Sequence, residues 1–69
     1  MIWHVTMHTS HFYFDAFGAT EEEANEAIGR ALEWHRQQYR LDADWWSDYD
    51  FNTRLVALGA GYRDEERVA

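Results

Sequence analysis

The chain has 69 residues, a net charge near −7, no cysteine, and arginine as its only strong base. This length predicts one domain, and the negative charge excludes nucleic acid and anionic membranes as direct partners, since both need a basic footprint. The lack of cysteine excludes disulfides and thiolate zinc sites. Together with the absence of any apolar run of about 20 residues, it predicts a cytoplasmic protein.

Two alternating segments at the N-terminus predict a β-hairpin. Residues 2–8 and 11–17 are rich in aromatic and β-branched side chains, and residues 9–10 are the expected turn. Thr-Ser is a weak signal for a type I′ turn, so a loop one or two residues longer is the alternative. In the register set by the two-residue turn His8 faces His11, and the apolar side chains share one face of the sheet. The residues on that face are Trp3, Val5, Met7, Phe12, Phe14 and Ala16.

Residues 21–39 have the pattern of one amphipathic helix. Gly18 ends the preceding strand, and Thr20 with Glu23 three residues later is a capping box. We expect the helix to bury one stripe against the sheet. Its members are Ala24, Ala27, Ile28, Ala31, Leu32, His35 and Tyr39.

Residues 42–50, with the sequence DADWWSDYD, place four carboxylates and three large aromatic side chains in nine positions. Asp42 or Asp44 is expected to cap a short helix over residues 43–49. Residues 51–62 then predict a third strand that ends near two glycines. We expect the charged C-terminal residues 64–69 to fray.

These elements predict an α+β fold in a single small domain, residues 1–69. The order β-β-α-(short α)-β indicates a two-layer sandwich with one amphipathic helix packed on one face of the sheet. The three strands are expected to form an antiparallel sheet in the order 2-1-3. Its other face is expected to be open to solvent.

The chain carries no motif that indicates catalysis. Neither a G-x-S-x-G elbow nor an H-E-x-x-H pair is present, so we expect no enzyme activity and no cofactor. The acidic stretch also fails as a calcium loop, because Ser47 replaces the required glycine and Thr53 the last ligand. An alternative hypothesis is a metal sensor on one sheet face, using His4, His8, His11 and Asp15.

The acidic residues fall into three blocks, of which the last is Asp64, Glu65 and Glu66. Carboxylates spaced over one face can occupy a protein groove that is built for phosphates, and aromatic side chains among them add affinity. The predicted partner is therefore the basic surface of a nucleic-acid-binding protein. The predicted contact residues are Asp42, Asp44, Asp48, Asp50, Glu22, Glu26, Glu33, Trp45, Trp46 and Tyr49.

In size, acidity, lack of cysteine and small α/β architecture, the whole chain resembles phage-encoded anti-CRISPR proteins. The resemblance is carried by this profile and not by a motif, so it assigns no individual residue. It implies a stoichiometric inhibitor in the host cytoplasm that binds a Cas effector subunit and blocks DNA or PAM recognition by DNA mimicry. The alternative hypothesis for the function is a homo-oligomeric structural or interaction module. The small core supports it, because oligomerisation is one way for a small domain to gain stability.

Overall fold

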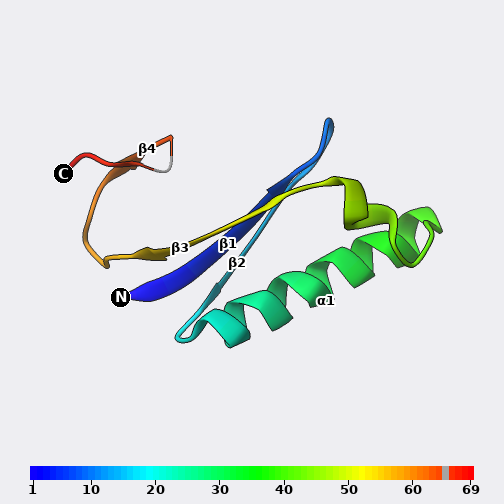
Figure 1. Ribbon diagram of the computed structural model, residues 1–69, viewed down its shortest axis with the longest axis horizontal. Helices are drawn as coiled ribbons and strands as arrows, with labels where there is room; N and C mark the ends of the chain where they lie inside the picture. Colours follow the sequence, from blue (N-terminus) through cyan, green and yellow to red (C-terminus); the bar gives the residue numbers. More distant parts are fainter. Residues whose placement is uncertain (65) are drawn as a thin grey trace.

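The computed structural model describes residues 1–64 and 66–69 and has two layers, a sheet and one long helix (Figure 1). β1 lies in the middle of a three-stranded sheet and is antiparallel to both β2 and β3, which confirms the predicted α+β fold and strand order. The elements are β1 (Ile2–His8), β2 (Tyr13–Gly18), α1 (Glu21–Tyr39), η1 (Trp45–Asp48), β3 (Phe51–Val56), β4 (Tyr62–Arg63) and β5 (Glu66–Arg67). Among the described residues, no helix has the length and apolar character needed to cross a bilayer.

The loop between β1 and β2 spans residues 9–12, which is the longer alternative and not the two-residue turn. His8 pairs with Tyr13 instead of His11, so the predicted register is wrong by two residues. Hydrogen bonds close the loop at residues 9–12: the Thr9 N–H donates to the Phe12 carbonyl at 2.8 Å, and the Phe12 N–H donates to the Thr9 hydroxyl at 2.9 Å. Because side chains alternate with period two, a shift of two leaves each one on its predicted face.

Helix α1 begins and ends at the predicted residues. The Glu23 N–H donates to the Thr20 hydroxyl at 3.1 Å, and the Glu23 carboxylate accepts from the Ala19 N–H at 2.9 Å. The capping box is therefore confirmed, with its return bond one residue earlier than in the usual arrangement. Gly18 lies directly under this first turn, where an added Cβ would come within 2.5 Å of the Ala24 nitrogen.

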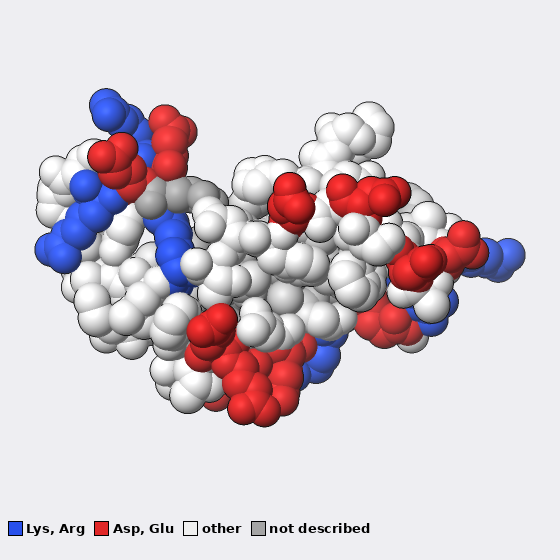
Figure 2. Space-filling view, viewed as in Figure 1, with Lys and Arg blue, Asp and Glu red and all other residues white. Residues whose placement is uncertain are grey.

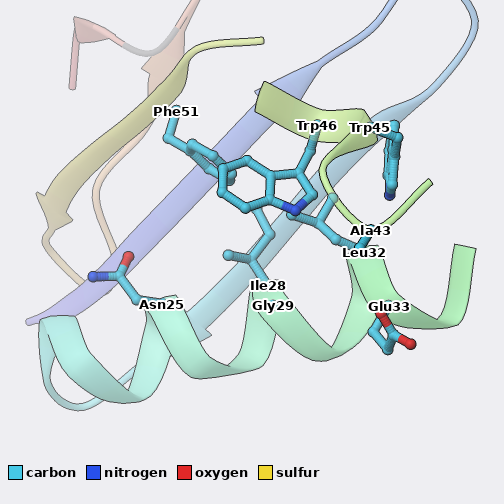
Figure 3. Close-up of a pocket in the computed structure, with 9 residues that line it drawn as sticks. All are labelled: Asn25, Ile28, Gly29, Leu32, Glu33, Ala43, Trp45, Trp46 and Phe51. Carbon is cyan, nitrogen blue, oxygen red and sulfur yellow. The ribbon is translucent and has the colours of Figure 1, made fainter. Parts of the chain in front are cut away.

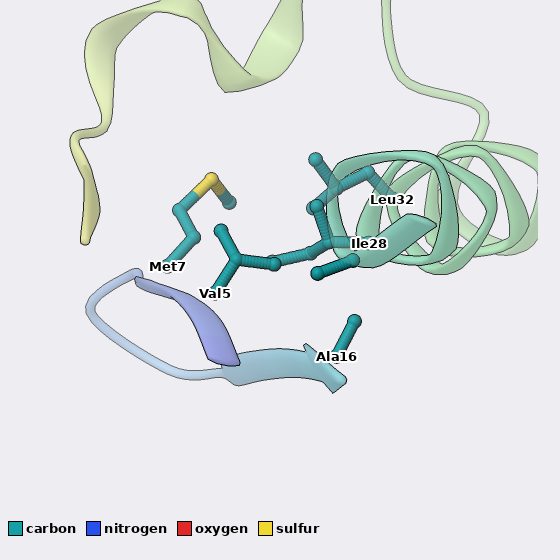
Figure 4. Close-up of a cluster of buried hydrophobic side chains, with 6 residues drawn as sticks. Val5, Met7, Ala16, Ile28 and Leu32 are labelled. Atoms are coloured by element: carbon teal, nitrogen blue, oxygen red, sulfur yellow. The ribbon is translucent and has the colours of Figure 1, made fainter. Parts of the chain in front are cut away.

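The hydrophobic core lies between α1 and the two strands β1 and β2 (Figure 4). Figure 4 shows Val5 and Met7 of β1 and Ala16 of β2 on the side of the sheet that faces α1, which contributes Ile28 and Leu32. Ala24 of α1 completes the set of buried core residues. The helix packs on β2 and β1, so the helix-side face of β3 keeps exposed apolar side chains.

The opposite face of the sheet is less open than predicted, because His4 and Thr6 are buried there. The His4 ring stacks on Phe17 with ring centroids 4.3 Å apart, and its Nε2 lies 3.1 Å from the Asp15 carboxylate. A guanidinium nitrogen of Arg54 lies 3.5 Å from His4 Nδ1. Neighbouring side chains on the sheet thus cover the imidazole that the sequence pattern placed in solvent.

The C-terminal residues form a second, two-stranded sheet that was not predicted. The predicted third strand over 51–62 ends at Val56, and Gly59 has a φ of 80°, which favours glycine. β4 and β5 then pair as a hairpin, closed by the Gly61 N–H donating to the Ala69 carbonyl at 2.9 Å. The fraying predicted for residues 64–69 stays a prediction, and Glu65 lies outside the described residues.

Candidate protein-binding groove

A groove of about 430 Å³ lies between α1, η1 and β3 (Figure 3). It exists because α1 packs mainly on β2 and β1, which leaves much of the neighbouring face of β3 uncovered. On that face Phe51 is 40% exposed and Leu55 44% exposed. The groove is lined by Asn25, Ile28, Gly29, Leu32, Glu33, Ala43, Trp45, Trp46 and Phe51.

The aromatic residues of the acidic stretch divide between the core and the groove. Trp45 and Tyr49 are half-buried and pack against the hydrophobic core, so much of their surface has a structural task. Trp46 is 40% exposed and meets Phe51 edge to face, with ring centroids 5.9 Å apart. Figure 3 shows the Trp46 ring reaching from η1 across the groove toward Ile28. Trp46 is therefore the aromatic side chain of this stretch most available to a partner.

The short helix predicted for residues 43–49 is a single 3-10 turn, and the predicted carboxylate cap is wrong. Asp44 occupies the N-cap position, but its side chain makes no capping hydrogen bond. The backbone carbonyls act instead: that of Asp42 accepts from the Trp45 N–H at 3.2 Å, and that of Asp44 accepts from the Ser47 N–H at 3.0 Å. In a 3-10 turn the backbone N–H groups donate to carbonyls three residues earlier in the chain. The carboxylates of Asp42 and Asp44 are therefore not used as caps.

The four carboxylates of the acidic stretch are all exposed. In the described part of the chain, none of them has a side-chain hydrogen bond or an ion pair. Each therefore presents an uncompensated charge to solvent on the η1 side of the groove. The residues are Asp42, Asp44, Asp48 and Asp50.

The helix supplies carboxylates on the other side of the groove. Glu22, Glu26, Gly29 and Glu33 follow one another at spacings of four, three and four residues, which places them on one side of α1. Figure 2 shows acidic side chains along the first turns of α1 and over η1, with an uncharged band between them. The two predicted acidic sets thus lie on α1 and in or beside η1, the two elements that border the groove, and Glu33 is the carboxylate of these sets that lines it.

Glu33 differs from the other carboxylates because it is already paired. Its two oxygens accept from Arg36 Nε at 2.8 Å and from Arg36 Nη2 at 2.6 Å. These charge-assisted hydrogen bonds lower the pKa of Glu33 and raise the pKa of Arg36. Gln37 also donates to Glu33, at 3.2 Å. Of the predicted helix carboxylates, Glu22 and Glu26 therefore present the less compensated charge.

The histidines predicted for a metal site do not come together. His4 is paired with Asp15, His8 packs beside Tyr13 with ring centroids 4.5 Å apart, and His11 lies in the loop. The two-residue shift in register separates His8 from His11. Over residues 1–64 and 66–69, no group of three or more His, Cys, Asp or Glu side chains is placed to hold a metal ion.

A second hollow, of about 450 Å³, lies on the other side of α1, and we call its lining the aromatic patch. Trp34 is its most exposed aromatic side chain, at 62%. The sequence offers one indication of this patch, because Trp34 falls outside the stripe of α1 that is predicted to be buried. The aromatic patch consists of Phe12, Tyr13, Phe14, Trp34, His35, Gln38 and Tyr39.

The lining of the groove is mostly apolar. Its floor and walls are apolar, and Asn25 and Glu33 are the polar members of its lining. An apolar side chain can bury surface there, while cationic groups beside it meet the carboxylates on either side. Comparison of the chain with protein-family models, with curated proteins and with solved structures finds no match.

Proposed function

We propose that this chain is a small inhibitor that binds the basic nucleic-acid-binding surface of a partner protein. One observation supports it above the others: exposed carboxylates lie on both sides of an apolar groove that contains an exposed tryptophan. An arrangement kept only for solubility has no need to surround an apolar groove with charge. A Cas effector subunit is a partner of the proposed kind, and cytoplasmic inhibition of its DNA or PAM recognition is the proposed outcome.

The proposed mechanism separates the speed of association from its strength. The net charge of −7 attracts a basic surface over long range and raises the association rate, and this effect weakens with salt. The apolar groove and Trp46 then supply contact area, since exposed ion pairs alone contribute little. Once bound, the carboxylates occupy the positions that phosphates need, so nucleic acid and this chain exclude each other.

Charge reversal of the acidic stretch tests the proposal. The partner is first identified by capture from a nuclease-treated host lysate and is then purified. The wild-type chain is expected to displace a labelled DNA duplex from that partner at low salt. The variant with Lys at all four of Asp42, Asp44, Asp48 and Asp50 is expected to lose at least about tenfold in affinity, because each side chain now repels the basic surface.

A matched control isolates position from net charge. Asp48→Lys with Asp50→Lys is compared with Asp64→Lys plus Glu66→Lys, which makes the same charge change on the distant hairpin. The first pair is expected to weaken binding much more than the second. If all variants keep the wild-type circular dichroism spectrum and bind equally well, the proposal is wrong.

A further inference from the structure

Gly29 lines the groove, and nothing in the described part of the fold requires a glycine at this position. It lies in the middle of α1, where glycine is less favourable than alanine. Beyond its chain neighbours and the adjacent helical backbone, a Cβ built on Gly29 meets no atom within 4 Å, and the residue is not among those with a left-handed backbone. Among residues 1–64 and 66–69, no packing or conformational reason for a glycine at this position is therefore found. A missing side chain does allow another chain to approach the helix closely.

The surroundings of Gly29 form an apolar notch. Ile28 and Leu32 on α1 are buried beside it, and Trp46 and Phe51 form the opposite wall (Figure 3). Because the two aromatic side chains are each 40% exposed, they keep surface that a bound apolar side chain can cover. The notch thus suits an aliphatic side chain that reaches the helix backbone at Gly29.

The charges beside the notch indicate what flanks such a side chain. Glu26 stands one turn before Gly29 on α1, and Asp48 and Asp50 stand on the η1 side, all exposed. These carboxylates complement cationic side chains on both sides of the apolar one. Arginine fits better than lysine, because a planar guanidinium stacks on an exposed tryptophan such as Trp46 and binds carboxylates in a bidentate manner.

We infer that the groove binds an arginine-bearing peptide segment of the partner protein, with an apolar side chain of that segment seated on Gly29. Arginines on either side of this anchor face the carboxylates of α1 and η1. The inference rests on the proposed function and adds to it the chemistry of the partner. Charge brings the partner to this face, and the anchor at Gly29 fixes the position in which it binds.

Two short peptides separate the anchor from the charge. The probes are acetyl-Arg-Arg-Leu-Arg-Arg-amide and the same peptide with Gly in place of Leu, titrated at low salt while tryptophan indole N–H signals are followed by NMR. The leucine peptide is expected to bind wild-type protein at least about tenfold more tightly, since a buried leucine supplies that much. Gly29→Leu fills the notch and is expected to remove this advantage.

The helix variants are designed to remain folded. Leu and Ala are both better helix formers than Gly, and an added Cβ at position 29 meets open space, so Gly29→Leu and Gly29→Ala should both fold. Gly29→Ala adds one methyl group to the notch and should reduce the preference for the leucine peptide to a value between those of wild type and Gly29→Leu. Equal binding of both peptides to wild-type protein overturns the inference and leaves charge attraction intact. If neither peptide binds, the inference also fails, and the Asp-to-Lys variants against the whole partner decide the proposed function separately.

Discussion

The groove and the aromatic patch lie on opposite sides of α1 and have nearly equal volumes, about 430 and 450 Å³, yet they suit different partners. Carboxylates flank the groove on both sides, whereas the aromatic patch has no acidic residue in its lining. Both hollows exist because one helix is too narrow to cover every apolar side chain of the sheet and its loops. We therefore expect the charge around each hollow, and not its volume, to select what it binds.

The same net charge has opposite consequences at the two sites. A second copy of a chain with charge −7 is repelled at the groove, where its own carboxylates would meet those of its partner. The aromatic patch has no such barrier, because its exposed rings are uncharged. The homodimer considered as an alternative stays a prediction, and the aromatic patch is the surface that would form it.

The largest expected effect comes from Gly18→Ala, which loosens the helix that separates the two sites. The added methyl would overlap the first turn of α1, with the Ala24 nitrogen only 2.5 Å away. We expect a loss of about 1–3 kcal/mol in the free energy of unfolding, the usual cost of overpacking. Urea denaturation measures it. Gly29→Ala is the contrast, with an expected gain of about 0.5–1 kcal/mol, and a Gly18→Ala variant as stable as wild type would contradict the packing described at that turn.

Exchanging one tryptophan at each site is expected to have a smaller and more selective effect. Trp46→Gln should weaken binding of the leucine peptide several-fold, because it removes the aromatic wall of the groove. Trp34→Gln should leave that affinity unchanged and should lower any self-association seen by light scattering at high micromolar concentration. Equal effects of the two variants on peptide affinity would mean that the two sites are not distinct in chemistry.

The smallest expected effect is the pH dependence of the stability that Glu33, at one edge of the groove, contributes. The hydrogen bonds from Arg36 lower the pKa of Glu33 below its ordinary value of 4.5. A lowered carboxyl pKa contributes stability above the unfolded-state value and loses it as the pH falls through the folded-state value. Glu33→Gln should therefore be slightly less stable than wild type at pH 7, and the difference should vanish in acid. Parallel urea titrations at pH 7 and pH 3 measure it, and a difference that grows in acid would contradict the assigned ion pair.

The features that local sequence determines were predicted well. Helix α1 begins and ends where the amphipathic pattern and the capping box place it, because both act between residues three or four apart. The strand order also followed, since three strands and one helix allow few sheets with short connections. The contact residues predicted from charge and aromatic content stay a prediction.

The wrong or missing predictions concern features that depend on particular hydrogen bonds or on contacts between residues distant in sequence. The β1–β2 register depends on how Thr9 and Phe12 close the loop, and a Thr-Ser pair carries little turn information. The hairpin of β4 and β5 has strands of only two residues each, too short for an alternating pattern to indicate. The burial of His4 depends on Phe17 and Arg54, which are distant in sequence from it.

By itself, then, the sequence determined an acidic α+β domain with one amphipathic helix and a stretch of carboxylates and aromatic side chains. Only the tertiary structure decided that this stretch and the Glu22–Glu33 side of α1 face each other across a groove. The physical reason is that the packing of a helix against a sheet selects which strands it covers. Here α1 covers β1 and β2, so the uncovered face of β3, the glycine at position 29 and two sets of charges meet in one place.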